Sequence, residues 1–291
     1  MRTIIALVIL ITLITLMSCD RHSIDVPVET SKLHVLSSVY PLADIVRQIA
    51  GQQIDLEWFC ENGQDPRDLR LSDEQKTHAH RADLILTSGF REAWAGDLLD
   101  AHQQSLRLLQ PESTPAGRNA PDPHGALWLD PQIARETADL IRVKLSVLDP
   151  KHEVEFRKNC EAFLKEVDAI DAEYRKRLAP LRGRPFLALR PTWSALAERY
   201  GLEEIAPIDT DPQHLTDADV RKLKETATER GTNTLVIDAA LLPGVQRELA
   251  NRTGLNLLPL DPLGSSAPDG HSTWTRLMRY NLEQLERGLK D

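Results

Sequence analysis

The 291-residue sequence lacks the short motifs that carry most hydrolytic and nucleotide-dependent chemistry. It contains no Gly-x-Ser-x-Gly nucleophile elbow, no Walker phosphate-binding loop and no His-Glu-x-x-His zinc pair. Basic residues are also few, with 35 Lys and Arg against 44 Asp and Glu, and neither a basic stripe nor a basic tail is present. We therefore predict a protein that is not an enzyme and does not bind nucleic acid.

Cysteine is scarce, with Cys19, Cys60 and Cys160 making up the whole complement. An oxidising compartment would permit Cys60 and Cys160 to form a disulfide. They lie far apart in the sequence and the second falls in a predicted helix, so two buried free thiols are the favoured state.

One long uncharged run opens the chain. Arg2 precedes the apolar stretch Thr3 to Leu16, which has the length of a signal-peptide core and is too short to span a bilayer well. The stretch predicts export. Loss of Arg2 with the signal peptide would make the formal net charge of −9 one unit more negative.

The end of this run resembles a lipobox, with the tetrad Leu16-Met17-Ser18-Cys19. The resemblance implies a signal peptide of residues 1–18, cleavage before Cys19, a lipid on the Cys19 thiol and a tether over residues 19–31. We therefore expect the mature protein to be anchored in a lipid bilayer, on the periplasmic or cell-surface side of a bacterial membrane.

Short apolar runs then alternate with amphipathic stretches, which is typical of parallel sheets covered by helices. Two such sets predict an α/β fold with two parallel-sheet lobes, residues 32–148 and 181–291. Strands are expected at Leu33–Val39, Ile54–Phe59, Asp83–Ser88, Leu106–Leu109, Phe186–Arg190, Ile205–Ile208, Thr234–Asp238 and Leu257–Asp261. Helices are expected near Leu42–Gly51, Ser72–His80, Glu92–Ala101, Gln132–Val147, Trp193–Tyr200, Thr216–Arg230, Pro243–Thr253 and Ser272–Leu289.

A long, rigid helix over about Lys151–Leu178 is predicted between the lobes, within a linking segment of residues 149–180. Apolar residues repeat there at intervals of three and four, which places them on one face of a helix. They are Phe156, Cys160, Phe163, Val167, Ile170, Tyr174 and Leu178. An exposed coiled-coil segment would show the same spacing. Because the stripe starts and stops where the two strand sets do, we expect the helix to contact both lobes.

Local sequences in both lobes resemble the zinc and manganese receptors of bacterial ABC importers. The matching segments, in the family's order, are Ser37–Gly51, Asn62–Ser72, Ala82–Trp94, Asp122–Pro131, Leu187–Leu202, Thr234–Val245, Leu257–Gly264 and Leu277–Leu285. The resemblance covers nearly the whole chain after the leader. It implies a monomeric solute-binding component that delivers zinc or manganese from an inter-lobe cleft to an ABC permease in the membrane.

The resemblance also implies four metal ligands, of which this sequence keeps two. His124 and Asp261 match family ligands, whereas Arg67 and Arg190 stand where the family has histidine or, at the second place, histidine or glutamate. Arginine has only donors and stays protonated, so it does not coordinate cations. One such charge 5 Å from a divalent ion costs on the order of 6 to 7 kcal/mol at an effective dielectric near 20. Weak or absent metal binding is therefore expected.

Three arrangements remain open for this altered cleft. Asp238, at the end of a predicted strand, could join His124 and Asp261 as a third metal ligand. The two arginines could instead hold an anionic or chelated ligand in their guanidinium forks. Alternatively, the cleft could hold no ligand, with Arg67 or Arg190 paired to Asp261. The rival functions are an enzyme on the same scaffold and a surface lipoprotein without a transport role.

The remaining histidines carry less weight. His78 and His80 lie two apart on a predicted helix and do not face the same way, so we expect both to point into solvent. His271 follows Asp269 closely and is expected to belong to a loop and helix cap rather than to a metal site.

Overall fold

The computed structural model describes residues 32–60, 64–88, 92, 94, 105–107, 125–267 and 271–290. Four predicted features lie outside the described residues. They are the leader, Cys19 with its tether, His124, and nearly all of the Glu92–Ala101 helix. Within the described part of the chain, no helix is both long enough and apolar enough to cross a membrane.

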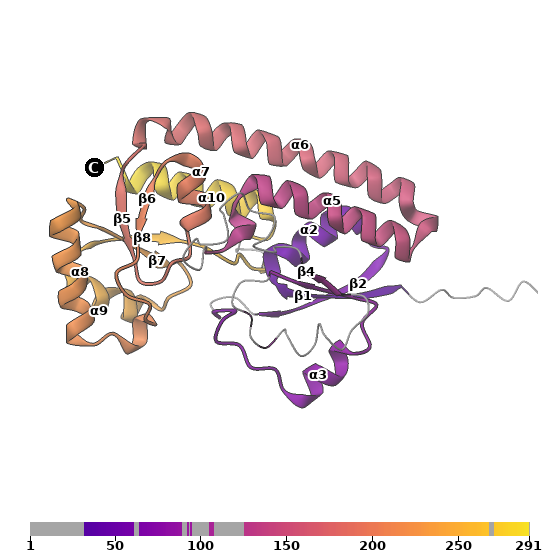
Figure 1. Cartoon of the computed structure of the whole chain (residues 1–291), viewed down its shortest axis with the longest axis horizontal. Coiled ribbons are helices and arrows are strands. Elements are labelled where there is room, and N and C mark those ends of the chain that lie inside the picture. Colours follow the sequence, from indigo (N-terminus) through magenta and orange to yellow (C-terminus); the bar gives the residue numbers. More distant parts are fainter. Residues whose placement is uncertain are drawn as a thin grey trace, which may run out of the picture. The chain divides into compact units, whose positions relative to one another are not determined.

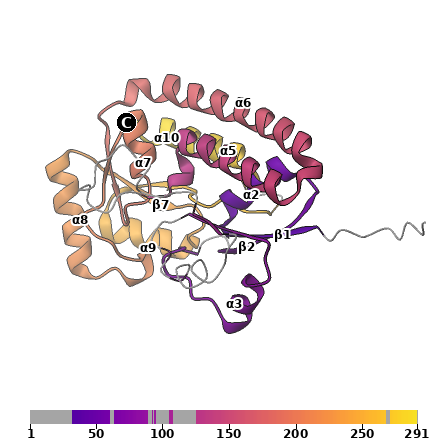
Figure 2. The same ribbon diagram turned by 45° about the vertical axis from the view of Figure 1, so that its right-hand side comes forward.

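The first lobe is a parallel four-stranded sheet in the order β2-β1-β3-β4. Its strands are β1 (Leu33–Val39), β2 (Ile54–Cys60), β3 (Leu84–Thr87) and β4 (Ser105–Arg107). Helices α2 (Tyr40–Ala50) and α5 (Pro131–Leu148) cover one face, and α3 (Asp73–Ala79) lies on the other (Figures 1 and 2). A capping box begins α3, because the side chains of Ser72 and Gln75 each accept a hydrogen bond from the other's backbone N–H.

The second lobe repeats this topology in the order β6-β5-β7-β8. Its strands are β5 (Pro185–Ala188), β6 (Glu203–Ile205), β7 (Thr234–Asp238) and β8 (Asn256–Leu260). Helices α8 (Asp217–Arg230) and α9 (Pro243–Thr253) pack on one face, with α7 (Ser194–Tyr200) and α10 (Trp274–Gly288) towards the other (Figure 1).

The prediction of a strand at Ile205–Ile208 is wrong, because β6 ends at Ile205. Here β6 is an edge strand that pairs only through Glu203–Ile205 with β5. Pro207 has no N–H to continue the ladder, so the apolar residues that follow leave the sheet.

The long helix α6 (Glu153–Leu178) follows a short 3-10 turn at Pro150–His152. Its 26 residues extend about 39 Å at 1.5 Å per residue. The buried side chains of α6 are the seven predicted ones, from Phe156 to Leu178. They pack against α2 and α5 of the first lobe and α7 and α10 of the second, which confirms the linking helix (Figure 1).

One hydrophobic core runs through both lobes beneath α6, while smaller clusters fill the far face of each sheet. At the junction, the Trp274 ring meets Phe163 edge-on at 5.7 Å, and its Nε1 donates to the Trp128 carbonyl at 2.7 Å. Trp274 N donates to Asp44 at 2.7 Å, and Trp128 Nε1 to the Pro262 carbonyl at 2.7 Å. The lobes therefore share a core and do not separate without exposing it.

Both described cysteines are buried and are not joined in a disulfide, as predicted. Cys60 ends β2 and Cys160 lies in the buried stripe of α6. Burial, followed by the nearby Asp139 carboxylate, raises the pKa of Cys160 to about 11, so this thiol stays protonated and unreactive at neutral pH.

We predict that Phe163→Ala destabilises both lobes together, because Phe163 belongs to the shared core. Removing a buried phenyl ring costs about 3–5 kcal/mol. Denaturant unfolding followed by tryptophan fluorescence and by far-ultraviolet circular dichroism should show one coincident transition at lower denaturant.

The matched control is Val154→Ala on the same helix, where the side chain is 66% exposed. This change should stay within about 0.5 kcal/mol of the parent protein. Two separate transitions in the Phe163 variant would contradict a core shared by the lobes.

Candidate functional site

A cavity of about 510 Å³ lies between the lobes at the carboxyl ends of their strands. The first lobe contributes the loop after β2, with Asp65 and Arg67, and the second contributes Arg190 after β5 and Asp238 at the end of β7. Parallel α/β sheets place ligands at this edge. The cavity is therefore the candidate ligand site, and it brings three of the five residues predicted for the cleft into its lining.

The loop after β2 is held in a turn by its own side chains. Asp65 accepts a hydrogen bond from Arg67 N at 2.9 Å, and Asp68 N donates to the Asp65 carbonyl at 3.0 Å. Trp94 Nε1 donates to the Pro66 carbonyl at 2.8 Å. An aspartate that bonds to the backbone two residues on is a common turn device, and here it sets the direction of the Arg67 side chain.

Arg190 is positioned from the second lobe by the turn that follows it. The carboxylate of Glu204 accepts hydrogen bonds from Thr192 N at 3.0 Å and Trp193 N at 2.9 Å, and it also bonds to the Ser194 hydroxyl. Burial raises the pKa of Glu204, although these donors oppose the rise. The turn is thereby fixed with Arg190 at its start.

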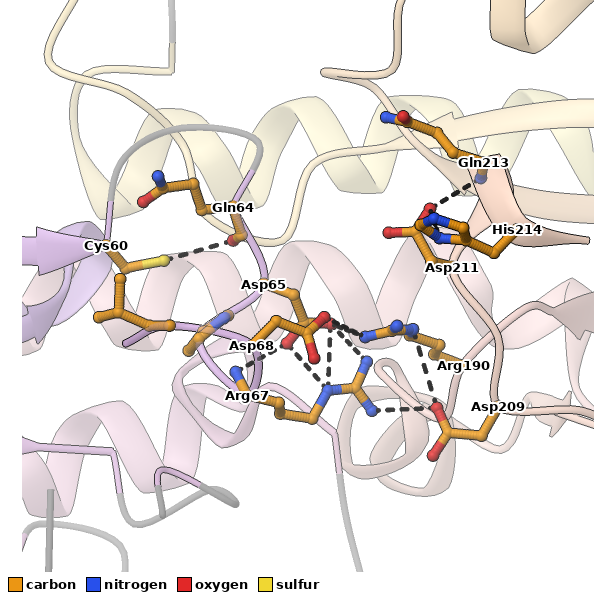
Figure 3. A network of polar contacts seen from close by, with 12 residues as sticks. Cys60, Gln64, Asp65, Arg67, Asp68, Arg190, Asp209, Asp211, Gln213 and His214 are labelled. Carbon is orange, nitrogen blue, oxygen red and sulfur yellow. Dashed lines mark hydrogen bonds and ion pairs between the residues drawn. The ribbon is translucent and has the colours of Figure 1, made fainter. Parts of the chain in front are cut away.

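Arg67 and Arg190 meet at Asp65 and link the two lobes across the cavity (Figure 3). Asp65 Oδ2 accepts from Arg67 Nη2 at 2.5 Å and from Arg190 Nη1 at 2.7 Å. Arg190 Nη1 also reaches Asp68 at 3.0 Å, and Arg67 Nη1 reaches Asp209 of the second lobe at 3.4 Å. Each arginine thus pairs with an acid of the opposite lobe. We call these five residues the arginine–aspartate network.

The network keeps Asp65 ionised. Burial alone would raise the pKa of Asp65, but hydrogen bonds from Arg67 and the charges of Arg67 and Arg190 outweigh it, so the net pKa is lowered. The stabilisation from these pairs is present above the ordinary value of 3.8 and is lost as the pH falls through the lowered pKa.

The ion pairs change the expected repulsion between the two arginines and a bound cation, which was calculated for arginines without partners. Asp65, Asp68 and Asp209 supply three negative charges around two guanidinium groups. A cation in the cavity therefore meets a network with a net negative charge. The arginines instead occupy the Asp65 carboxylate oxygens by donating hydrogen bonds to them.

Asp238 lies in the cavity wall among other acids. Burial, and then the charges of Asp261 and Asp65, raise its pKa to about 6, although Ala240 N donates to it at 2.8 Å. Asp238 thus carries a proton in mildly acidic solution, and a bound cation would favour its charged form.

Asp261 is buried and already engaged. Its Oδ1 accepts from Leu263 N at 3.0 Å and Gly264 N at 2.7 Å, and its Oδ2 lies 2.7 Å from His271 Nδ1. Asn281 of α10 holds the Asp261 backbone through two further bonds. The structure does not show the alternative in which Arg67 or Arg190 pairs with Asp261, because loop amides and His271 occupy its oxygens.

The predicted metal trio of His124, Asp238 and Asp261 stays a prediction. His124 lies outside the described residues, and among the described residues no group of three metal-ligand side chains converges in the cleft. The next residue, Gly125, has φ +41°, and a Cβ there would lie 2.2 Å from the Thr192 carbonyl oxygen. Glycine therefore lets this segment of the first lobe press against the second, where Ala126 N donates to Thr192 O at 2.7 Å.

The acidic partners of the two arginines, Asp65, Asp68 and Asp209, were not predicted as such from the sequence. Asp65 stands two residues before Arg67, which is the spacing of a side-chain turn and was available as a signal. Nothing local to Asp209 indicates that it faces Arg67, because that contact crosses between lobes.

The architecture is that of a two-lobed solute-binding protein, in which a cleft opens between α/β lobes joined by one helix. A family model described as "Zinc-uptake complex component A periplasmic" matches residues 35–288. The chain therefore belongs to this family of periplasmic substrate-binding transport proteins, rather than to a class of enzymes.

Individual relatives match the chain over most of its length. It is 22% identical to the high-affinity zinc uptake system protein ZnuA of Bacillus subtilis (strain 168), over 89% of this chain and 88% of that protein. It is also 22% identical to the metal ABC transporter substrate-binding lipoprotein ScbA of Streptococcus cristatus, over 97% of this chain and 96% of that protein. These relatives agree with the resemblance found in the sequence.

Solved structures share the fold. The Zn(II)-bound ZnuA-like domain of Streptococcus pneumoniae AdcA gives a TM-score of 0.76 at 21% identity, covering 90% of this chain and all of that one. The periplasmic zinc-binding protein TroA of Treponema pallidum gives 0.77 at 17% identity, again covering 90% of this chain and all of that one. At these identities the structures confirm the two-lobed fold.

We predict that Asp238→Asn stabilises the protein at neutral pH. The folded-state pKa of about 6 exceeds the ordinary 3.8, so the stability of the parent protein falls as the pH rises through this interval. Asparagine removes the buried charge and keeps an acceptor for Ala240 N, and the gain at pH 7.5 should be about 1–3 kcal/mol. Urea unfolding from pH 4 to pH 8 measures it.

Glu225→Gln, on the exposed face of α8, is the control and should show no such dependence on pH. A gain from Asp238→Asn that is equally large at pH 4 would contradict the raised pKa.

Proposed function

We propose that this protein is the extracytoplasmic solute-binding component of a zinc- or manganese-type ABC importer and passes its cargo to a membrane permease. The observation that carries the proposal is the cavity lined by both lobes at the carboxyl ends of their strands, in a chain that belongs to this family. Two relatives that match nearly end to end are named as zinc or metal uptake proteins, and another is a manganese transporter lipoprotein of Streptococcus gordonii.

The charges around the cavity favour a cation over an anion. The arginine–aspartate network is net negative, and Asp238 and Asp261 add two further carboxyl groups nearby. The guanidinium groups already donate to aspartates, so an anion would have to displace them. A divalent ion would instead lower the cost of ionising Asp238.

Free metal should nevertheless bind weakly, at micromolar affinity or poorer. A nanomolar site needs about −12 kcal/mol. In this cleft an ion must first take Asp65 from Arg67 and Arg190, which gives up several charge-assisted hydrogen bonds. Because the ion binds weakly, we expect it to dissociate readily from the proposed receptor.

We predict that Arg67→His combined with Arg190→His raises zinc affinity by about a hundredfold or more, equivalent to about 2.7 kcal/mol. The change removes both cations, frees Asp65 and supplies two imidazole ligands of the kind zinc prefers. Titration against a competing chelator gives the affinity. Trp128 and Trp193 line the cavity, so tryptophan fluorescence reports occupancy of the cleft.

Arg70→His is the matched control, because Arg70 lines the same cavity from the same loop, but within the described part of the chain its guanidinium bonds only to the Leu69 carbonyl. It should leave affinity unchanged. Nanomolar zinc binding in the cleft of the parent protein, or no gain in the double variant, would sink the idea of an arginine-blocked site.

We propose that the protein acts as a monomer and is tethered to the membrane through a lipid on Cys19. Support for the tether is the Leu16–Cys19 tetrad and the lipoprotein names of relatives such as ScbA.

We predict that Cys19→Ala leaves an unprocessed precursor, because lipid attachment to the thiol precedes cleavage of this class of leader. Immunoblotting should show a larger band, and the detergent phase should lose the mature protein. Cys60→Ala, a buried thiol, should be processed normally. Equal processing of the Cys19 variant and the parent would refute the anchor.

A further inference from the structure

A second group of metal-ligand side chains lies on the first lobe, outside the cleft. It consists of His34 on β1, Glu57 on β2 and His78 at the end of α3. We propose that these three residues bind one divalent ion, zinc in preference to calcium or magnesium, independently of the cleft. We call this group the peripheral site.

Strand register brings the first two ligands together. In the parallel pair β1–β2, His34 is level with Asp55 and Leu36 is level with Glu57. Side chains alternate between faces along a strand, so His34 and Glu57 lie on one face, two positions apart. The third ligand comes from α3, which packs Ala79 into a cluster with Leu36 on that same face.

The distances suit a shared ion. Glu57 Oε2 lies 3.1 Å from His78 Nε2, and Glu57 Oε1 lies 3.5 Å from His34 Nε2. The three ligand atoms fall within 4.8 Å of one another. Zinc bonds of about 2.0–2.2 Å place tetrahedral ligand atoms roughly 3.3 Å apart. Each histidine nitrogen already lies close to that separation from one of the two Glu57 oxygens, and a small movement of the exposed Glu57 and His78 side chains would complete the site.

The chemistry of the donors points to zinc. Two imidazoles and one carboxylate form a donor set that zinc accepts with water in the fourth place, whereas calcium and magnesium prefer oxygen ligands throughout. His34 Nε2 is shielded from solvent and makes no hydrogen bond to any residue that the structure describes, although it faces Glu57. Ligation would give this buried nitrogen a partner.

Two of the three ligands have room to move, whereas His34 is fixed. The His34 backbone exchanges hydrogen bonds of 2.8 Å with Asp83, and its side chain is only 20% exposed. The side chains of Glu57 and His78 are 56% and 44% exposed and can close on an ion. An open fourth position and two solvent-facing ligands predict fast exchange of the ion.

The peripheral site is separate from the cavity. His34 is near the amino end of β1, and the cavity is at the carboxyl ends of the strands. Five strand positions from His34 to Val39 correspond to roughly 16 Å. An ion bound here therefore leaves the arginine–aspartate network untouched.

Cobalt(II) titration of the mature full-length protein at pH 7.5 tests the proposal, because four-coordinate cobalt absorbs strongly in the visible range and reports its ligands directly. The parent protein should show one such ion, displaced by zinc. His78→Gln and Glu57→Gln should each weaken it roughly tenfold or more. His80→Gln, on the exposed neighbouring position of α3, is the matched control and should bind as the parent does.

Asp238→Asn, a variant in the cleft, distinguishes the peripheral site from the cleft. It should keep the visible absorption of four-coordinate cobalt. The proposal is overturned if the parent shows no four-coordinate cobalt, or if His78→Gln and Glu57→Gln bind as tightly as His80→Gln. Loss of the signal in Asp238→Asn alone would place the ion in the cleft and also overturn it. Circular dichroism of each variant verifies that it is folded.

Discussion

The shared core beneath α6 is the constraint on which the rest of the molecule depends. Seven buried side chains along one face of this helix pack against helices of both lobes, and Trp274 ties α10 to Phe163 and Trp128 at the junction. Opening the lobes as separate bodies would expose this surface to water at about 25 cal/mol per Å². We therefore expect the two lobes to keep their relative placement when a ligand binds.

Because the two lobes are held together, Arg67 and Arg190 can bind one shared carboxylate in the cleft. With the lobes held together, Arg67 and Arg190 reach the same carboxylate, Asp65, from opposite sides. Arg67 and Arg190, which the resemblance places at metal-ligand positions, thus take part in a net negative link between the lobes. Such a link is compatible with a receptor whose cargo is a cation held more loosely, because binding must compete with internal hydrogen bonds.

The sequence predicted what local periodicity controls and missed what depends on contacts between distant elements. The bounds of β1 and β7 follow from short apolar runs, those of α9 from Pro243 at its start and Gly254 after its end, and the buried stripe of α6 from its three-four spacing. The acidic partner Asp209 could not be predicted, because its contact with Arg67 joins two lobes. His78 was judged on its helix alone, whereas its partners lie on two strands whose register the pattern does not reveal.

The ion pair between Asp65 and Arg190 joins the two lobes. A double-mutant cycle with Asp65→Asn and Arg190→Gln tests this pair most directly. Unfolding free energies of the parent, both single variants and the double variant give the coupling of this pair at pH 7. The side chains are 27% and 19% exposed, so a coupling of about 1–3 kcal/mol is predicted, persisting in moderate salt. A coupling near zero would contradict the account, because the arginine would then not be held at the metal position.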